Sequence, residues 1–182
     1  RLRPAWFEMA RAVVALAALL VVAALGLRSL DELPGMAAGV ARGVRRVGSI
    51  AALERQASHK LPIPAYFPDT LAWPPNQFLI FGGTSASMSF RHRHAAGTWL
   101  LVAMAVGTTT VAPQVLPPAT RLQTEATTVR SFPATVERLR DPDGVIWYQL
   151  TWRTSGVTRL VRYRGTLDQA MLIANSMDER GR

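Results

Sequence analysis

The residues of this chain with the clearest potential for chemistry are two histidines, His92 and His94. They lie two positions apart in a predicted strand, and side chains at that spacing share one face of a sheet. Two imidazoles on one face could begin a metal site, which needs at least a third protein ligand. The chain has three histidines and no cysteine, so His59 is the only other ligand of these kinds. Because Arg91 and Arg93 flank the pair and repel a cation, we expect neither a bound metal nor a haem.

Carboxylates and nucleophiles show no catalytic arrangement either. The paired acids are Asp31 with Glu32, Asp141 with Asp143, and Asp178 with Glu179. The first pair follows an apolar run, the second falls in a predicted turn, where aspartate is usually structural, and the third lies near the C-terminus. The chain contains no G-x-S-x-G elbow, H-E-x-x-H helix, phosphate-binding loop or dinucleotide fingerprint. We therefore expect a protein that is not an enzyme, uses no cofactor and takes no small-molecule substrate.

Basic side chains gather on one predicted hairpin near the C-terminal end. They are Arg153, Arg159, Arg162 and Arg164. Aromatic residues lie close by, and arginine with aromatic rings is a combination that binds nucleic acid. The whole chain has a net charge of +9, but the part from residue 61 onward is only weakly basic. We interpret the arginines as a solvated face, or as a patch for acidic proteins or anionic headgroups, and expect no nucleic-acid partner.

The strongest pattern in the chain is an apolar run from Ala12 to Leu27, AVVALAALLVVAALGL, which holds no charge, hydroxyl or amide. As a helix it spans about 24 Å at ~1.5 Å per residue, somewhat less than a hydrocarbon core of about 30 Å. Flanking arginines can extend to the headgroups, and aromatic residues before the run suit the membrane interface. The residues that we expect to form the membrane anchor are Trp6, Phe7, Arg11, Leu19, Leu20 and Arg28.

Other interpretations of this run fit less well. A cleaved secretory signal has a shorter apolar core, and Leu27-Arg28-Ser29-Leu30 makes a poor cleavage site. A buried helix of a small soluble domain is rarely apolar on every side. We predict a single transmembrane helix within residues 1–30 of a bacterial cytoplasmic membrane protein. The positive-inside count is nearly balanced, so the orientation, N-terminus inside, depends on the arginine-flanked N-terminal tail and on the long remainder, which resembles a translocated domain.

Residues 31–60 predict an amphipathic connecting helix. Their apolar positions recur at helical spacing, at Met36, Val40, Val44, Val47, Ile50 and Leu53. Gly35, Gly39 and Gly43 recur every fourth residue, which on a helix makes a smooth ridge for close packing against a partner's helix. Each glycine also weakens a helix by up to about 1 kcal/mol relative to alanine. Packing on a partner is our leading interpretation; a helix lying on the headgroups and a tether without a partner remain open.

Residues 61–182 predict a β-rich domain of the α+β class. It opens with a proline-rich segment, residues 61–75, whose aromatic side chains indicate an ordered strap over the domain. Strand patterns follow at residues 77–81, 87–93, 98–106, 127–140, 145–153 and 157–164, with a long loop at 107–126. Thr166 to Met177 predicts an amphipathic helix that starts with a Thr166–Gln169 capping box. We expect an antiparallel sheet of five or six strands with this helix at its C-terminal end.

Part of this pattern resembles a known class of domain. The proline-rich start at Leu61–Pro68, the D-G-x-x-W-Y-x-L strand at Asp143–Leu150, and the Gly165-Thr166 stop before a helix ending Ile173–Met177 carry the resemblance. They are similar to the β-rich extracytoplasmic domains of single-pass bacterial membrane proteins, including some transmembrane anti-sigma factors. Such regulators carry a cytoplasmic domain, often with metal-binding histidine and cysteine, before the membrane helix. Here eleven cysteine-free residues precede the apolar run, so the resemblance supports the fold and compartment more than a regulatory role.

These features together predict a non-enzymatic accessory subunit of a larger bacterial membrane protein complex. The membrane anchor would hold it beside other membrane protein subunits in the lipid bilayer, and the β-rich domain would cap the complex on the extracytoplasmic side. A respiratory or photosynthetic electron-transfer assembly is one candidate for that complex. The alternative is a single-pass signalling regulator of the anti-sigma-factor type with an extracytoplasmic sensory domain. A lone domain that binds lipid or the cell envelope is a third possibility.

Overall fold

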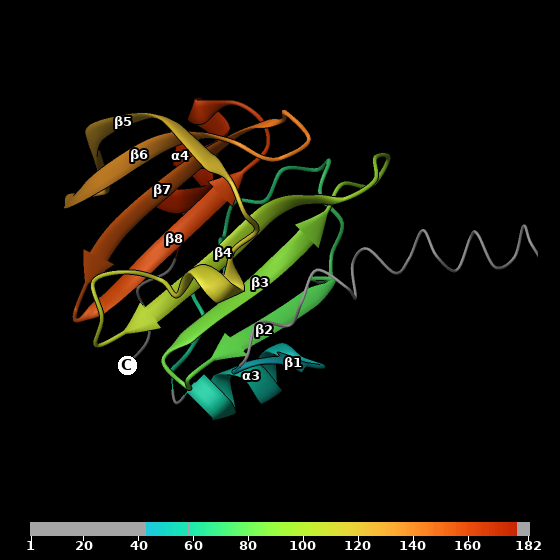
Figure 1. The fold of residues 1–182 in the computed structure, drawn as a ribbon, viewed down its shortest axis with the longest axis vertical. Helices are drawn as coiled ribbons and strands as arrows, with labels where there is room; N and C mark the ends of the chain where they lie inside the picture. Colours follow the sequence, from blue (N-terminus) through green and yellow to red (C-terminus); the bar gives the residue numbers. More distant parts are fainter. Residues whose placement is uncertain (1–42, 58, 178–182) are drawn as a thin grey trace, which may run out of the picture. The chain divides into compact units, whose positions relative to one another are not determined.

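The computed structural model describes residues 43–57 and 59–177. Within them the chain forms eight strands, two α-helices and one short 3-10 helix (Figure 1). In chain order these are β1 (Val44–Val47), α3 (Ile50–Ala57), β2 (Gln77–Phe81), β3 (Ser85–Arg91), β4 (Thr98–Val106), η1 (Pro113–Val115), β5 (Thr120–Val129), β6 (Phe132–Arg140), β7 (Ile146–Thr154), β8 (Val157–Tyr163) and α4 (Leu167–Asn175).

All the described strands belong to one antiparallel sheet, in the order β1-β2-β3-β4-β8-β7-β6-β5. The sheet consists of two meanders, β1 to β4 and β5 to β8, that join where β4 pairs with β8. After β4 the chain therefore runs to the far edge of the sheet and returns strand by strand. This order leaves β1 at one edge and β5 at the other (Figure 1).

The sheet is larger than the sequence predicted, so the expectation of five or six strands is wrong. One missed strand, β5, begins at Thr120, within the stretch that we expected to be a long loop. The predicted strand at 127–140 is divided by a two-residue turn at Arg130-Ser131, and its two parts pair with each other from Val129↔Phe132 onward. The other missed strand is β1, which pairs with β2.

The predicted connecting helix is wrong for its middle part, although its last part is helical. Val44–Val47 form a strand, and the helix α3 begins only at Ile50. Gly43, expected to lie on a helical ridge, has a φ of 96°, and a Cβ added there would lie 3.0 Å from the Phe81 ring. As a strand, β1 gains main-chain partners on β2 and buries Val44. The apolar spacing would also suit a helix, but glycine weakens that helix, so strand pairing is favoured.

The remaining predictions for the N-terminal part lie outside the described residues. These residues are Trp6, Phe7, Arg11, Leu19, Leu20 and Arg28 of the predicted anchor, and Gly35 and Gly39 of the predicted ridge. Within residues 43–57 and 59–177, no helix is both long and apolar enough to cross a bilayer.

One face of the sheet, the helix face, is covered by α3, α4 and the strap. Its core mixes aliphatic and aromatic side chains, and its fully buried members include Leu53, Leu71, Phe90, Val102, Val161 and Ile173. The helix α4 starts as predicted, because the Thr166 side chain accepts a hydrogen bond from the Gln169 N–H. Burying each such aliphatic side chain contributes about 1.5–3 kcal/mol, so this face supplies most of the hydrophobic stabilisation.

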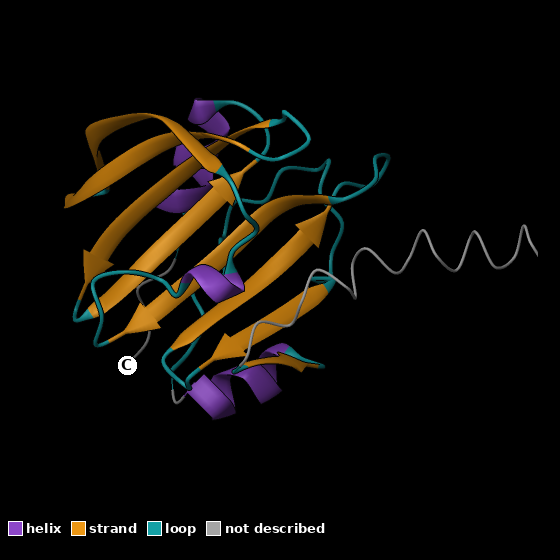
Figure 2. Cartoon of the chain, in the orientation of Figure 1, coloured by secondary structure: helices purple, strands orange, loops and turns teal. Residues whose placement is uncertain are grey.

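The opposite face, the loop face, is covered by the β4–β5 connection at residues 107–119, which includes η1 (Figure 2). Its small core consists of Leu101, Ala103, Ala105, Val111, Val115 and Leu160. The connection is held by hydroxyl groups of the sheet: Ser87 Oγ donates to the Val115 carbonyl at 3.0 Å, and Thr158 Oγ1 donates to the Thr108 carbonyl at 2.7 Å. Small side chains on this face let the irregular backbone lie close to the strands.

The turn between β5 and β6 is held by the last residue of α4. Arg130 takes a left-handed conformation, with φ 55°. Its backbone N–H donates to Asn175 Oδ1 at 2.6 Å, and its Nε donates to the Asn175 carbonyl at 2.9 Å. We call this contact the Arg130–Asn175 clasp. It joins two parts of the chain that lie 45 positions apart.

Candidate functional site

The two histidines singled out by the sequence lie together in the fold, and one of them contacts a tryptophan. The ring centres of His92 and His94 are 6.1 Å apart, and the His94 N–H donates to His92 Nδ1 at 3.1 Å. The His92 ring centre lies 4.2 Å from that of Trp99, and the Arg164 guanidinium lies 4.8 Å from the same tryptophan ring. This geometry favours ring stacking and a cation–π contact. Among residues 43–57 and 59–177, no three side chains of the metal-ligating types form a group.

Three arginines of the predicted basic patch lie in different surroundings. Arg164 contacts Trp99, Arg153 is exposed, and Arg162 is buried with 6% of its surface exposed. Arg162 instead belongs to a row of side chains that crosses the loop face, which we call the polar ladder. Its members are Arg162 on β8, Gln149 on β7, Glu137 on β6 and Arg121 on β5.

Each step of the polar ladder joins side chains on neighbouring strands. Arg162 donates to Gln149 Oε1 from Nε at 2.9 Å and from NH2 at 2.7 Å, and to the Pro117 carbonyl from NH1 at 2.6 Å. Gln149 Nε2 donates to Glu137 Oε2 at 2.6 Å, and Arg121 Nε lies 2.7 Å from Glu137 Oε1. Burial lowers the pKa of Arg162 to about 10, although the Glu137 charge opposes the shift. The guanidinium is therefore charged at neutral pH, and its partners inside the chain satisfy it.

The sequence analysis missed the polar ladder because its members are twelve or more positions apart. The signal that would have found it is the register of two hairpins. If residues are counted outward from the turns at 142–144 and 155–156, Glu137 falls opposite Gln149, and Gln149 falls opposite Arg162. A charged residue, an amide and a second charge in adjacent register positions indicate a cross-strand network.

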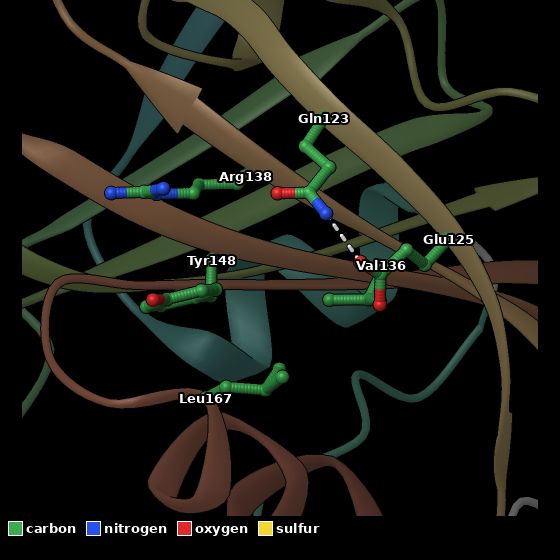
Figure 3. A pocket seen from close by; sticks show the side chains of 6 residues that line it. All are labelled: Gln123, Glu125, Val136, Arg138, Tyr148 and Leu167. Carbon is green, nitrogen blue, oxygen red and sulfur yellow. Dashed lines mark hydrogen bonds between the residues drawn. The ribbon is translucent and has the colours of Figure 1, made fainter.

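An open hollow of about 220 Å³ lies on the helix face beside the start of α4 (Figure 3). It is lined by Gln123 and Glu125 of β5, Val136 and Arg138 of β6, Tyr148 of β7 and Leu167 of α4. Figure 3 shows Arg138 and Tyr148 pointing the same way, while Gln123 turns its amide nitrogen toward Glu125, to which it donates a hydrogen bond. The sequence analysis did not identify this hollow, since two of its six lining residues belong to the missed strand β5.

The hollow suits a side chain of another protein better than a small-molecule substrate. Its volume is below the roughly 300–1,000 Å³ of typical ligand pockets. Arg138 and the Tyr148 hydroxyl can donate hydrogen bonds to a carboxylate or a carbonyl, above an apolar floor made by Val136 and Leu167. The Glu125 carboxylate, the one acid in the lining, already accepts from Gln123. No acid–base pair is therefore arranged here for catalysis.

The strap is ordered, as its composition predicts. Leu61 and Leu71 are buried with 4% and 1% of their surface exposed. The backbone N–H of Ala65 donates to the Ser176 carbonyl at 3.2 Å, and that of Ala72 donates to the Arg91 carbonyl at 2.8 Å. Arg93 Nε donates to the Leu71 carbonyl at 2.9 Å. These contacts fix both halves of the strap to α4 and β3.

Three large apolar side chains of the strap nevertheless face solvent. The exposed fractions are 37% for Ile63, 39% for Tyr66 and 55% for Trp73. The inner side of the Trp73 ring packs on two other rings. It makes an edge contact with Phe67 and stacks on Phe90, with ring centres 6.1 Å apart in each case. Trp73 is thus an exposed but well-positioned aromatic side chain.

Comparisons with protein-family models, with curated proteins and with solved structures find no match for this chain. Its class is therefore defined by its own architecture, a single antiparallel sheet covered by helices on one face and by an irregular connection on the other.

Proposed function

We propose that this chain is a non-enzymatic accessory subunit of a larger bacterial membrane protein complex, whose sheet domain binds other subunits on the extracytoplasmic side. The observation that carries the proposal is the exposed and fixed ring of Trp73. Tryptophan and tyrosine are enriched at the centres of protein interfaces. A ring already held by Phe67 and Phe90 loses little conformational freedom when a partner covers it.

The apolar sequence from Ala12 to Leu27 supports attachment of this subunit to the cytoplasmic membrane, with the N-terminus inside. Other membrane protein subunits and the bilayer are then the partners. The hollow at Arg138 and Tyr148 supports the same function, because it can receive an acidic or carbonyl-bearing side chain of a neighbour. A respiratory or photosynthetic electron-transfer assembly remains one candidate for the complex.

The proposal is tested by recovering partners with the full chain after mild detergent extraction. We expect Trp73→Ala to lose most of the co-purifying subunits that the wild type retains. Leu172→Ala is the matched control, since Leu172 on α4 is 53% exposed, close to the 55% of Trp73. Both variants should stay folded and should stay in the membrane fraction after a carbonate wash, although Trp73→Ala lowers the melting temperature somewhat because the ring contacts with Phe67 and Phe90 are lost. Equal recovery of partners by Trp73→Ala and the wild type would contradict the proposal.

A single-pass signalling regulator of the anti-sigma-factor type is the second candidate. It is favoured by the β7–β8 hairpin followed directly by α4, the part of the chain that carries the resemblance to such proteins. The two functions differ in their readouts. Deleting a regulator changes the transcription of a defined set of genes while membrane complexes stay intact, whereas deleting a subunit destabilises one complex without that transcriptional signature.

A further inference from the structure

The strand β5 forms a long open edge of the sheet. It has ten residues, of which eight are exposed, whereas an average strand has about 5–6 residues. Among the residues that the structure describes, no strand pairs with its outer side. Such an edge presents unpaired backbone N–H and C=O groups to any chain that can lie beside it.

The hairpin geometry shows which backbone groups of β5 point outward. Val129 and Phe132 close the two-residue turn, and residues that flank such a turn are hydrogen-bonded to each other. Because inward and outward groups alternate along an antiparallel strand, Thr124, Ala126 and Thr128 direct their N–H and C=O groups away from β6. The register is regular throughout this stretch, since the only irregularity lies between Arg121 and Gln123.

This stretch lacks the features that usually prevent edge pairing. From Gln123 to Val129 there is no proline and no lysine, and Glu125 is the only charged side chain. Natural edges are protected by short length, prolines and charges. The opposite edge of this sheet fits that description, because β1 has four residues and its two arginines, Arg45 and Arg46, are exposed.

We propose that β5 pairs with β5 of a second copy of this chain, antiparallel, about a two-fold axis at Ala126. In that register Thr124 lies opposite Thr128 of the second copy, Glu125 lies opposite Thr127, and Ala126 lies opposite itself. No like charges meet, and cross-strand threonine pairs are favourable. The three outward residues of each copy supply about six hydrogen bonds between the copies. The result is one sheet continuous across a symmetric dimer, the commonest form of oligomer.

Other registers of the same pairing fit this edge less well. An axis at Glu125 would place two carboxylates directly opposite each other, and like charges in that position are destabilising. An axis at Thr127 leaves part of the regular stretch unpaired. The choice of a second copy therefore comes from the self-complementary order of side chains from Gln123 to Val129.

Disulfide trapping tests the register directly, because the chain has no cysteine of its own. In the proposed dimer the two Ala126 Cα atoms lie about 5.5 Å apart, within the range of about 4.4–6.8 Å that a disulfide spans. Oxidising membranes that hold the full-length Ala126→Cys chain should give a covalent dimer on a non-reducing gel. Thr124→Cys is the control, since its two thiols would lie about four residues apart along the strand, whereas Thr124→Cys/Thr128→Cys should cross-link again.

Charges introduced at Thr124 and Thr128 give a second test that needs no oxidation. Thr124 lies opposite Glu137 of β6, so a lysine at 124 is tolerated within one copy. Thr124→Lys/Thr128→Glu should keep the dimer, because opposite charges meet across the axis. Thr124→Lys/Thr128→Lys should weaken dimerisation by about tenfold or more, as measured by sedimentation of the detergent-extracted chain. Absence of a disulfide dimer from Ala126→Cys, an equal yield from Thr124→Cys, or equal dimerisation of the two charge variants would overturn the proposal.

Discussion

The two faces of the sheet bury their side chains by different means. On the helix face, α3, α4 and the strap pack on large apolar side chains of the sheet such as Met88 and Phe90, and both are fully buried. On the loop face, residues 107–119 cover alanines and serines, and beside them Arg162 is buried together with its hydrogen-bond partners. A helix satisfies its own backbone groups, whereas an irregular connection must find partners on the sheet. The loop face is therefore polar because of what covers it.

The largest effect that this comparison predicts is on the helix face. Ile173→Ala should lower the free energy of unfolding by about 2–5 kcal/mol, because the cavity left behind α4 is enclosed and apolar. Urea denaturation of the full chain measures the change. The adjacent Leu172 is 53% exposed, so Leu172→Ala should change the stability by about 0.5 kcal/mol or less. Similar losses for the two variants would show that α4 does not bury the face that the packing assigns to it.

On the loop face, the cost should come from a lost acceptor. Gln149→Leu removes the oxygen that takes two hydrogen bonds from Arg162, and we expect a loss of about 1–3 kcal/mol. The double variant Gln149→Leu/Arg162→Met should recover much of that loss, since a buried charge is no longer left without a partner. A thermodynamic double-mutant cycle by urea denaturation measures the coupling. Additive losses would mean that the polar ladder does not act as a unit.

The smallest expected effect is a pH dependence at Asp141, in the β6–β7 turn. Partial burial raises the pKa of Asp141, but hydrogen bonds from Trp147 Nε1 at 2.9 Å and the Val145 N–H at 2.8 Å outweigh it, so the pKa lies below its ordinary value. The stabilisation from this carboxylate is therefore present above about pH 4 and is lost as the pH falls below that.

Urea midpoints measured between neutral pH and acid test this expectation. Asp141→Asn should be less stable than the wild type at neutral pH and should lose less stability on acidification. Asp143→Asn, which changes an exposed acid in the same turn, is the control and should follow the wild type. An identical acid dependence for Asp141→Asn and the wild type would exclude a stabilising role for this carboxylate.

Sequence patterns predicted the elements that are buried on one face only, or on both faces. The continuous apolar run of β4 and the apolar run of β2 give the observed bounds, and the alternating pattern of β7 and the capping box of α4 come within two residues. The strand β5 escaped because it is largely exposed and its few apolar residues follow no strand period. Its turn at Arg130-Ser131 carries no glycine, asparagine or proline, since Asn175 on α4 stabilises it from a distance.

The candidate site was predicted less well than the fold. The proximity of His92 and His94 follows from local spacing, but the contact of His92 with Trp99 depends on the next strand of the sheet. The exposure of Trp73 could not be predicted from its surrounding prolines, because it depends on how Phe67 and Phe90 fill the space beneath it. The polar ladder required the register of four hairpin-linked strands. Local patterns indicate elements, whereas sites arise from the pairing between them.

The Arg130–Asn175 clasp has a consequence for the order in which the protein can be completed during synthesis. The β5–β6 turn lies 45 positions before the residue that holds it. At a synthesis rate of about 5–20 residues per second, the ribosome needs roughly 2–9 s to add that stretch. During this interval the turn lacks its two hydrogen bonds to Asn175, and β4 still lacks its partner β8. The second half of the sheet therefore closes only after Asn175 has emerged, and β5 is already present as an open edge that a neighbouring nascent copy can meet.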